Sequence, residues 1–230
     1  MSSSPGRRVL ASWSSGKDSA WMLHVLRQDP EVEVVGLVTT FAEATDRVAM
    51  HGVPRSLVER QATAAGLPLR SVFLPWPCPN AEYEARMSKL FREAVADGVT
   101  HIAFGDLFLE EIRDYRIGQL AGTGLEPLFP IWCGPEGTAD LARRMIEGGL
   151  RATLTCVDSR QLDPAFVGRP FDANLLRDLP PTVDPCGERG EFHTFCWSGP
   201  HQANPVPLAL RTGAVTERDG FVFAEPILAD

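Results

Sequence analysis

The chain has 230 residues, of which 44% are hydrophobic and 23% are charged, and its formal net charge at pH 7 is −8. This size and composition predict a globular protein with one large domain, or with one domain and a smaller second one. The acidic balance argues against a broad nucleic-acid surface, and five cysteines without a C-x-x-C pair argue against a zinc site or a disulfide framework.

The first 130 residues alternate between apolar runs typical of strands and periodic segments typical of helices. Strands are expected over 9–13, 31–40, 69–74, 99–104 and 128–132. Helices are expected over 20–27, 54–65, 80–97 and 108–120, with Asn80 as the N-cap of the third, and residues 41–50 are expected to form a loop. This alternation predicts an α/β fold with a doubly wound parallel sheet.

The pattern changes after about residue 130. A helix is expected over 138–147, a strand over 150–157, an irregular stretch with a short helical piece near Leu175 over 159–181, and a strand over 192–197. Residues 205–228 are typical of a hairpin that turns at Arg218-Asp219-Gly220. We therefore predict a first domain over residues 1–130 and a smaller α+β domain over residues 131–230.

The segment Ser14-Ser15-Gly16-Lys17-Asp18-Ser19 lies between the first strand and the first helix and has the composition of a phosphate site. Backbone N–H groups at a helix N-terminus favour a bound anion, and Gly16 allows a close approach of the backbone. The hydroxyls of Ser14, Ser15 and Ser19 can donate to phosphate oxygens, while Lys17 supplies a positive charge. The alternative is a serine-rich turn with an N-cap and a solvated lysine.

This segment is not a Walker A loop, because Asp18 follows the lysine and the spaced glycines of G-x-x-x-x-G-K-[ST] are missing. A carboxylate beside phosphates repels them unless a divalent cation lies between the two groups. Asp18 is therefore a candidate Mg²⁺ ligand.

Two further segments are expected to lie near this loop. Thr39-Thr40-Phe41 lies at the end of the second strand, and Gly105 and Asp106 follow the fourth strand. Because ligands of open parallel sheets bind outside the carboxyl ends of strands, these residues and the serine-rich loop should face one crevice. Asp106 either holds Mg²⁺ or a ribose hydroxyl there, or it caps the next helix.

Several polar residues are open to two interpretations. Glu188 and Glu191, in the loop Cys186-Gly187-Glu188-Arg189-Gly190-Glu191, either shape a substrate pocket, where one could accept a proton from an amine or hold a metal, or belong to a charged surface turn. His51 and His193 either contact a ligand or are solvated and packing residues. The helix that carries Glu110, Arg113 and Arg116 either uses them for binding or presents them as one solvated face.

Four motifs together resemble one family: S-S-G-K-D-S at 14–19, R-V-A-M-H-G-V at 47–53, F-G-D-L-F-L-E-E-I-R-D-Y-R at 104–116 and D-P-C-G-E-R-G-E-F-H-T-F at 184–195. The chain is similar to the diphthine–ammonia ligase-like ATP-binding proteins, a branch of the adenine nucleotide alpha hydrolase-like (HUP) superfamily. The first motif resembles the pyrophosphate loop of the N-type ATP pyrophosphatases, S-G-G-K-D-S, with Ser15 in place of the commoner glycine. The fourth motif is the most specific mark of the family.

The resemblance implies an ATP-dependent, AMP-forming ligase that adenylates a carboxylate, releases pyrophosphate and forms an amide with ammonia. The family's ligase acts on diphthine, a modified histidine of translation elongation factor 2. The implied cofactors are ATP and Mg²⁺, with Lys17, Asp18 and Asp106 as catalytic residues, the two aspartates as metal ligands and Lys17 stabilising the departing pyrophosphate. Residues 14–19, Thr39 and Gly105 would bind the nucleotide. The implied substrate-binding residues are His51, Glu110, Arg113, Glu188, Glu191 and His193.

Two departures from the family pattern concern the acceptor. The family's C-G-E-G-G-E-[YF]-E-T is C-G-E-R-G-E-F-H-T here, with Arg189 for glycine and His193 for glutamate. The variant is more similar to bacterial members, which do not make diphthamide, so one alternative is a paralogue that acts on another carboxylate, for example in cobalamin salvage. A non-catalytic ATP-binding sensor is a second alternative. A tRNA sulfur transferase on the same loop would need cysteine pairs and a basic surface, which this sequence lacks.

The expected partners are ATP, ammonia and a small-molecule or protein-borne carboxylate, and a homodimer is a possible assembly. No nucleic-acid or membrane partner is expected, since no apolar run reaches the length of a membrane span. Reduced thiols are the default for this cysteine pattern, and the N-terminus lacks a signal-peptide core, so we expect a soluble cytoplasmic protein.

Overall fold

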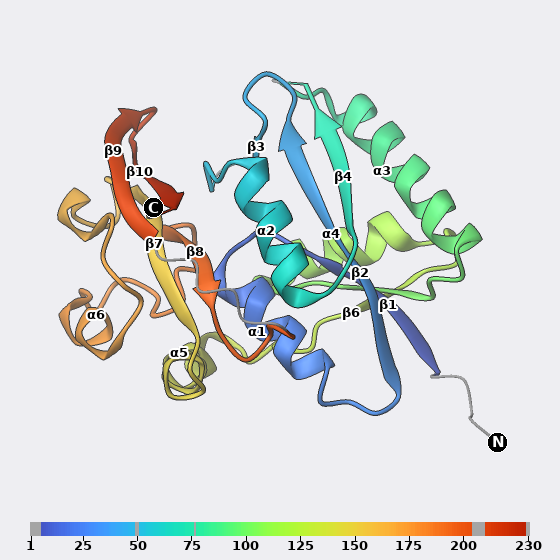
Figure 1. Ribbon diagram of the computed structural model, residues 1–230, viewed down its shortest axis with the longest axis horizontal. Helices are drawn as coiled ribbons and strands as arrows, with labels where there is room; N and C mark the ends of the chain where they lie inside the picture. The colour runs from blue at the N-terminus through green and yellow to red at the C-terminus, as the bar shows by residue number, and fades with distance from the viewer. Residues whose placement is uncertain (1–5, 49–50, 76, 204–209, 229–230) are drawn as a thin grey trace.

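The computed structural model describes residues 6–48, 51–75, 77–203 and 210–228. Its larger sheet, sheet A, contains β1 (Arg7–Ser12), β2 (Val32–Ala42), β3 (Arg47–Val48), β4 (Leu69–Leu74), β5 (His101–Ala103) and β6 (Glu126–Leu128). The strand order is β3-β2-β1-β5-β6, and β4 also pairs with β2. All pairings are parallel except that of the short β3 with β2, which confirms the predicted parallel sheet (Figure 1).

Helices cover both faces of sheet A. These are α1 (Lys17–Leu26) and α2 (Arg55–Ala65) on one face, and α3 (Asn80–Ala96) and α4 (Glu110–Leu120) on the other. Val9 and Ala11 of β1 belong to the larger buried cluster, with α1 and α2, whereas Leu10 belongs to the smaller cluster, with α3 and α4. Successive side chains of a strand point to opposite faces, so the apolar run of β1 is buried on both sides.

A second, antiparallel sheet, sheet B, follows in the last third of the chain. It has the order β8-β7-β10-β9 and contains β7 (Arg151–Asp158), β8 (Phe192–Ser198), β9 (Leu210–Arg218) and β10 (Phe221–Leu228). Asp219 and Gly220 both have positive φ at the turn between β9 and β10, which confirms the predicted hairpin there. Residues 205–209 of that prediction lie outside the described residues.

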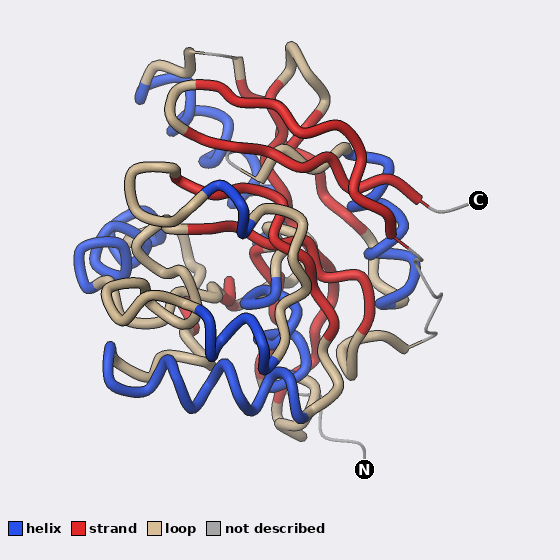
Figure 2. Tube along the Cα trace, turned by 90° about the vertical axis from the view of Figure 1, so that its left-hand side faces the viewer, coloured by secondary structure: helices blue, strands red, loops and turns tan. Residues whose placement is uncertain are grey.

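Sheet B packs beside α1 and is accompanied by α5 (Thr138–Glu147) and α6 (Ala173–Asp178). Figure 2 views the molecule from this side. The larger buried cluster extends into this half of the chain and includes Leu150 and Phe195. The expected division into a first domain over residues 1–130 and a smaller domain over residues 131–230 stays a prediction.

Several predicted boundaries were wrong. The strand expected over 128–132 is β6, Glu126–Leu128, because Pro130 cannot donate to a sheet ladder and residues 129–132 form a turn. Pro79, not Asn80, is the N-cap of α3. The expected loop over 41–50 contains the end of β2 and the short β3, and its residues 49–50 are not described. Helix α1 begins at Lys17, inside the serine-rich motif, and α4 begins at Glu110.

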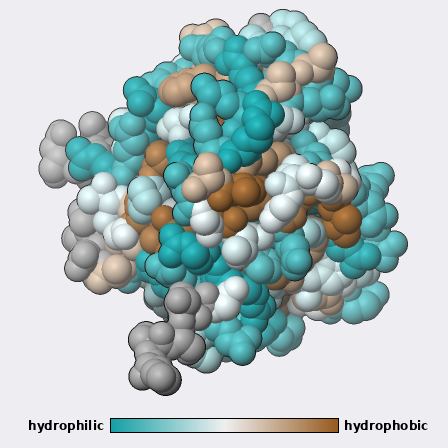
Figure 3. Space-filling model, turned by 90° about the vertical axis from the view of Figure 1, so that its right-hand side faces the viewer, coloured by the Kyte–Doolittle hydropathy of each residue, from teal (hydrophilic) through white to brown (hydrophobic). Residues whose placement is uncertain are grey.

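The surface is polar with scattered apolar side chains. Val95 of α3 and Ile117 of α4 are exposed, and Figure 3, which faces the α3 side of the molecule, shows apolar surface between polar regions. Exposed apolar side chains of this kind are common on folded proteins. In the described ranges, none of the helices has both the length and the apolar character needed to cross a membrane.

One buried histidine links the end of sheet B to the end of β1. His201 is fully buried, and its ring lies 5.9 Å from that of Trp13, measured between centroids. Neither ring nitrogen has a hydrogen-bond partner among the described residues. Burial, together with the charges of Arg27 and His24, lowers the pKa of His201 from 6.5 to about 4. The ring is therefore neutral in the folded protein at neutral pH.

This burial predicts a loss of stability in mild acid. The unfolded chain takes up a proton at His201 below about pH 6.5, but the folded protein does so only below about pH 4, so the free energy of unfolding should fall as the pH drops between these values. His201→Phe keeps a ring and removes the titration, so it should reduce this fall by about 2–3 kcal/mol. Urea unfolding as a function of pH measures the difference, and identical pH slopes for the variant and the natural protein would contradict the assignment.

Candidate active site

The serine-rich loop between β1 and α1 is fixed in place by α2. Gln61 of α2 is fully buried, and its Nε2 donates to the carbonyl oxygens of Ser15 (3.0 Å) and Cys196 (2.5 Å). Its Oε1 accepts a hydrogen bond from Trp13 Nε1 at 2.9 Å. One amide side chain thereby joins the loop to both α2 and β8, and it satisfies backbone groups that burial would otherwise leave unpaired.

Strand β8 holds the same loop from the opposite side. The backbone N–H of Lys17 donates to Thr194 Oγ1 at 3.1 Å, and the N–H of Cys196 donates to the carbonyl oxygen of Ser15 at 2.9 Å. A Cβ at Gly16 would lie only 3.2 Å from the carbonyl oxygen of Thr194. The glycine therefore permits the close contact between the loop and sheet B.

The loop contains a strained residue at the position where the related pyrophosphate loop has glycine. Ser15 has φ of +72°, in the left-handed region that residues with a Cβ seldom adopt. Its hydroxyl is buried and has no hydrogen-bond partner in the described part of the chain. Both features lower the stability of the folded protein. Ser15 does not line either of the cavities described below.

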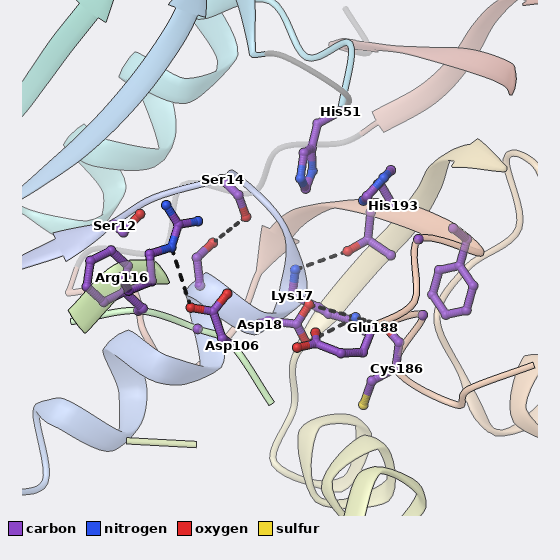
Figure 4. A pocket seen from close by; sticks show the side chains of 17 residues that line it. Ser12, Ser14, Lys17, Asp18, His51, Asp106, Arg116, Cys186, Glu188 and His193 are labelled. Carbon is purple, nitrogen blue, oxygen red and sulfur yellow. Dashed lines mark hydrogen bonds and ion pairs between the residues drawn. The ribbon is translucent and has the colours of Figure 1, made fainter. Parts of the chain in front are cut away.

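A polar cavity of about 260 Å³ opens where α1 begins, between sheet A and sheet B. Figure 4 shows its side chains, with Arg116 and Asp106 across the cavity from Cys186 and His193. Its lining combines residues that are far apart in the sequence: Ser12, Ser14, Lys17, Asp18, Ser19, His51, Phe104, Gly105, Asp106, Arg116, Cys186, Gly187, Glu188, Gly190, Phe192, His193 and Thr194.

Lys17 is the buried cation of this cavity. Its Nζ contacts both carboxylate oxygens of Asp18, at 2.8 and 3.0 Å, and donates to the carbonyl oxygen of Cys186. Burial acts to lower the pKa of Lys17, but the charge and hydrogen bond of Asp18, with the charge of Glu188, outweigh it, and the pKa is raised. Burial also raises the pKa of Asp18, yet two short contacts to Nζ favour the charged pair.

Asp106 lies on the other side of the cavity, at the end of β5. Its Oδ2 is 3.8 Å from Arg116 Nε, and this oxygen is buried without a hydrogen-bond partner among the residues described. Burial raises the pKa of Asp106, and the charge of Asp18 adds to this effect while Arg116 opposes it. Asp106 does not cap the next helix, because Leu109 is the N-cap of α4. A Cβ at Gly105 would lie 3.3 Å from Ser19 N, so this glycine allows β5 to approach α1.

Two carboxylates organise the loop that closes the cavity. Asp184 Oδ2 accepts hydrogen bonds from the N–H groups of Cys186 (3.1 Å) and Glu188 (3.0 Å). Glu191, which is 1% exposed, accepts from the N–H groups of Asp184 (2.9 Å) and Arg189 (3.0 Å). The alternative of a charged surface turn is therefore wrong for this loop. Glu191 shapes the loop, whereas Glu188 lines the cavity.

Glu188 is the carboxylate of this loop that faces the other cavity residues. Its Oε1 accepts a hydrogen bond from the N–H of Leu107 at 2.8 Å, which ties the loop to the end of β5. Burial raises the pKa of Glu188 from 4.5 to about 7, with the nearby charges of Asp18 and Asp106 adding to the effect of burial. A carboxyl group with this pKa can exchange a proton at neutral pH.

His51 and His193 lie against each other in the cavity wall, with ring centroids 4.6 Å apart. Burial lowers the pKa of His51 to about 3 and that of His193 to about 4. Both rings are therefore neutral at pH 7 and can each donate one hydrogen bond. The Nδ1 of His51 is buried and has no partner in the described residues.

The cavity fits a divalent cation that is shared with a phosphate ligand. Asp18, Asp106 and Glu188 place three carboxylates in the lining, and Asp106 has a buried oxygen without a partner in the described chain. The described residues contain no group of three or more His, Cys, Asp or Glu side chains arranged to hold a metal by themselves. Mg²⁺ is commonly bound by only one or two carboxylates together with phosphate oxygens and water, so this arrangement suits it.

A second, more apolar cavity of about 300 Å³ adjoins the polar one. It shares Ser12, Ser14, His51, Phe104, Arg116 and His193 with the polar cavity. The rest of its lining comes from β2, β3, β5 and the helices α3 and α4, with Trp13 after β1: Trp13, Val38, Thr40, Val48, Tyr83, Met87, Leu90, Phe91, Ile102 and Gln119.

Most of the predicted site residues lie in these walls, but several do not. Thr39 is buried, and its Oγ1 donates to the carbonyl oxygen of Trp13 at 2.7 Å; its neighbour Thr40 lines the apolar cavity instead. Glu110 is exposed on α4, and the guanidinium of Arg113 lies 4.7 Å from the ring centroid of Trp132. The described lining of both cavities omits Ser15, Gly16, Thr39, Glu110, Arg113 and Glu191.

The residues that were not assigned to the site include Arg116, Thr194, Gln61 and Asp184, although Arg116 was considered with Glu110 and Arg113 as either a binding residue or part of a solvated face. Arg116 lines both cavities, Thr194 and Gln61 hold the serine-rich loop, and Asp184 organises the loop around Glu188. Arg116, Asp184 and Thr194 lie within the motifs, and the spacing of Asp184 two residues before Cys186 is typical of an Asx turn. No local signal identifies Gln61, because its partners are distant in the sequence.

The strain at Ser15 predicts a stabilising substitution. Ser15→Gly should raise the free energy of unfolding by about 1 kcal/mol, because glycine adopts positive φ without steric cost and removes a buried hydroxyl that lacks a partner. Thermal and urea unfolding measure the change. Ser14→Gly, a neighbouring residue outside the positive-φ set, is the control and should not stabilise the protein. Equal changes in the free energy of unfolding for Ser15→Gly and Ser14→Gly would argue against backbone strain at Ser15.

Comparison with known families adds one result. Residues 7–121, which are half of the chain, match the family model of the diphthamide synthase N-terminal domain. The match spans β1 to α4 and includes the serine-rich loop, Asp106 and Arg116. No curated protein matches the chain. The parallel sheet with helices on both faces is consistent with a HUP-like fold. The chain therefore belongs to the diphthine–ammonia ligase-like family of ATP-utilising enzymes, within the ATP pyrophosphatase superfamily.

Proposed function

We propose that this protein is an AMP-forming ligase that uses ATP to adenylate a carboxylate, releases pyrophosphate and forms an amide with ammonia. The observation that carries this proposal is the meeting of Lys17, Asp18, Asp106 and Glu188 in one cavity at the start of α1. Family membership supports the use of ATP. The cavity adds groups suited to phosphate, to a metal and to proton transfer.

The pyrophosphate end of ATP would lie against the first turn of α1. This helix begins at Lys17, with Gly16 as its N-cap; the N–H of Lys17 donates to Thr194 Oγ1, and helix N-termini favour anions. Ser14 and Ser19 line the cavity beside it and can donate hydrogen bonds. Lys17 Nζ would either break its hydrogen bond to the carbonyl oxygen of Cys186 or donate to that oxygen and to the ligand together. Its positive charge would stabilise the departing pyrophosphate.

Mg²⁺ would be held by Asp106 and Asp18, and it would neutralise phosphate charge in a cavity that is otherwise rich in carboxylates. The nucleoside would occupy the adjoining apolar cavity. Its wall offers Thr40 and Gln119 as polar groups among apolar side chains, which is the usual composition of a small-molecule pocket. Thr40 therefore replaces Thr39 as the candidate contact from β2.

The reaction then takes place at the boundary of the two cavities. An oxygen of the acceptor carboxylate attacks the α-phosphorus, the bond to the bridging oxygen of pyrophosphate breaks, and an acyl-adenylate forms. Ammonia next attacks the acyl carbon, the bond to the AMP oxygen breaks, and the nitrogen loses a proton. Glu188 is placed to take that proton, since its carboxyl lines the cavity and its pKa is about 7.

The acceptor would enter from the side of residues 131–230, while residues 1–130 would bind ATP. Support comes from the family match, which ends at residue 121, and from Glu188 and His193, which reach the cavity from the second half. A neutral histidine at position 193 replaces a negative charge of the family motif, so the acceptor differs in charge or shape from diphthine, or contacts this wall differently. The proposed acceptor is therefore a carboxylate, without restriction to diphthine.

The direct test measures AMP and pyrophosphate release from ATP and Mg²⁺, with and without ammonium, against a panel of carboxylates that includes diphthine-bearing elongation factor and corrinoid precursors. Release that depends on one acceptor and on ammonium would support the ligase. ATP binding without AMP formation under all these conditions would contradict it and favour a nucleotide-binding sensor.

Lys17→Ala should lower the rate of pyrophosphate release by about 10²–10³-fold, because it removes the buried cation from the leaving group. Lys89→Ala is the matched control, since Lys89 is the other lysine of the chain and its side chain is 73% exposed. The control should retain full activity, and circular dichroism should show that both variants are folded. A Lys17→Ala variant with the natural rate would rule out the proposed role of Lys17.

Glu188→Gln should change the pH profile of amide formation. In the natural protein the rate at saturating ATP and constant free ammonia should rise as the pH increases through about 7, since Glu188 accepts a proton only when it is ionised. The variant should be slower at pH 8 by about 10²-fold and should lack this rise. Glu111→Gln, on the exposed part of α4, removes the same charge as a control and should keep the natural profile. An unchanged profile in Glu188→Gln would exclude it as the base.

A further inference from the structure

Two arginines on α4 have similar positions on the helix but different surroundings. Arg113 and Arg116 are one turn apart, and the guanidinium of each lies over an aromatic ring, Trp132 for Arg113 and Phe104 for Arg116. The ring of Phe104 is part of the wall that the polar and apolar cavities share. Arg116 belongs to that shared wall, whereas the described lining of both cavities omits Arg113.

The contacts of Arg116 leave its hydrogen-bonding capacity largely unused. Its guanidinium carbon is 5.0 Å from the centroid of the Phe104 ring, a distance that allows a cation–π interaction. Its Nε is 3.8 Å from Asp106 Oδ2, too far for a hydrogen bond, and this buried Nε has no partner among the residues that the structure describes. A planar, permanently charged group with free donors is suited to a phosphate.

Arg116 also differs from the other groups of the shared wall in its charge. His51 and His193 are neutral at pH 7, and Ser12 and Ser14 carry only hydroxyls. Lys17 lies in the polar cavity alone, where Asp18 and the Cys186 carbonyl oxygen already contact its Nζ. Arg116 is thus the permanent cation of the described boundary between the two cavities.

We infer that Arg116 binds the α-phosphate of an adenine nucleotide at this boundary. The inference rests on the proposed function, which places the nucleoside in the apolar cavity and the pyrophosphate at the start of α1. A nucleotide bound in this way must pass its α-phosphate along the shared wall, within reach of the guanidinium. Because this phosphate remains on the adenylate after pyrophosphate leaves, Arg116 would hold the activated acceptor while ammonia attacks.

The prediction is a division of labour between the two cations. Removal of Arg116 should lower the affinity for every ligand that carries an α-phosphate, including AMP. Removal of Lys17 should lower the affinity for ATP more than the affinity for AMP. Adenosine has no phosphate, so its affinity should depend on neither residue. This pattern separates a phosphate contact from a general effect on the cavity.

The experiment is isothermal titration of adenosine and AMP in the presence of EDTA, so that no metal contributes, and of ATP with and without Mg²⁺. It compares the natural protein with Arg116→Met, Arg116→Lys, Arg113→Met and Lys17→Ala. Arg113→Met is the matched control, since it removes an equal charge and a comparable aromatic contact, with Trp132, one turn away. Arg116→Met should lose at least about tenfold in AMP affinity, with adenosine affinity changed by less than about twofold. Arg116→Lys should be intermediate, and Arg113→Met should bind AMP as the natural protein does.

Three results would overturn the inference alone: an unchanged AMP affinity in Arg116→Met, a parallel loss of adenosine and AMP affinity in that variant, or an equal loss of AMP affinity in Arg113→Met. The second result would show that Arg116 supports the cavity wall, and the third would show a general effect of charge. If the natural protein bound neither adenosine, AMP nor ATP, the proposed function would fail, and the inference with it.

Discussion

The buried ammonium of Lys17 joins two segments of the chain. It begins α1, its Nζ forms an ion pair with Asp18, and it donates to the carbonyl oxygen of Cys186 in the second half of the protein. An unpaired charge at this depth would cost several kcal/mol, so the segments that satisfy it must stay together. The loop around Glu188 therefore supplies part of the polar environment that offsets the cost of burying the charge of Lys17. The site forms only when both halves of the chain are folded.

The fold could be predicted well wherever local residues mark the ends of an element. Strand β4 lies between Pro68 and Pro75, and α5 lies between Gly137 and Gly148, and the observed bounds of both equal the predicted ones. The errors occur where pairing with a distant strand decides the structure. The two residues of β3 become a strand only through their contact with β2, and no periodicity can reveal so short an element.

The candidate site shows the same limit. Ser14, Lys17, Asp18 and Ser19 of the serine-rich loop, together with Asp106 and Glu188, were predicted because motifs and strand ends identify them, and they line one cavity. Arg113 was expected to bind substrate, but Arg116 lines the cavity instead, since residues three apart occupy the same helix face and only the position of α4 decides which of them reaches the cavity. Glu191 was expected in the pocket, but the N–H groups of its own loop occupy both of its carboxylate oxygens.

Strand β8 has two functions that cannot be separated. It is an edge strand of sheet B, and it also supplies the hydroxyl and the N–H that fix the backbone of the serine-rich loop. Thermodynamic linkage then requires reciprocity: a ligand that tightens the loop must tighten β8, and an acceptor that displaces β8 must change the affinity for nucleotide by the same factor. If nucleotide and acceptor bind as proposed, they would therefore not be independent ligands, because each would alter the binding free energy of the other through one shared strand.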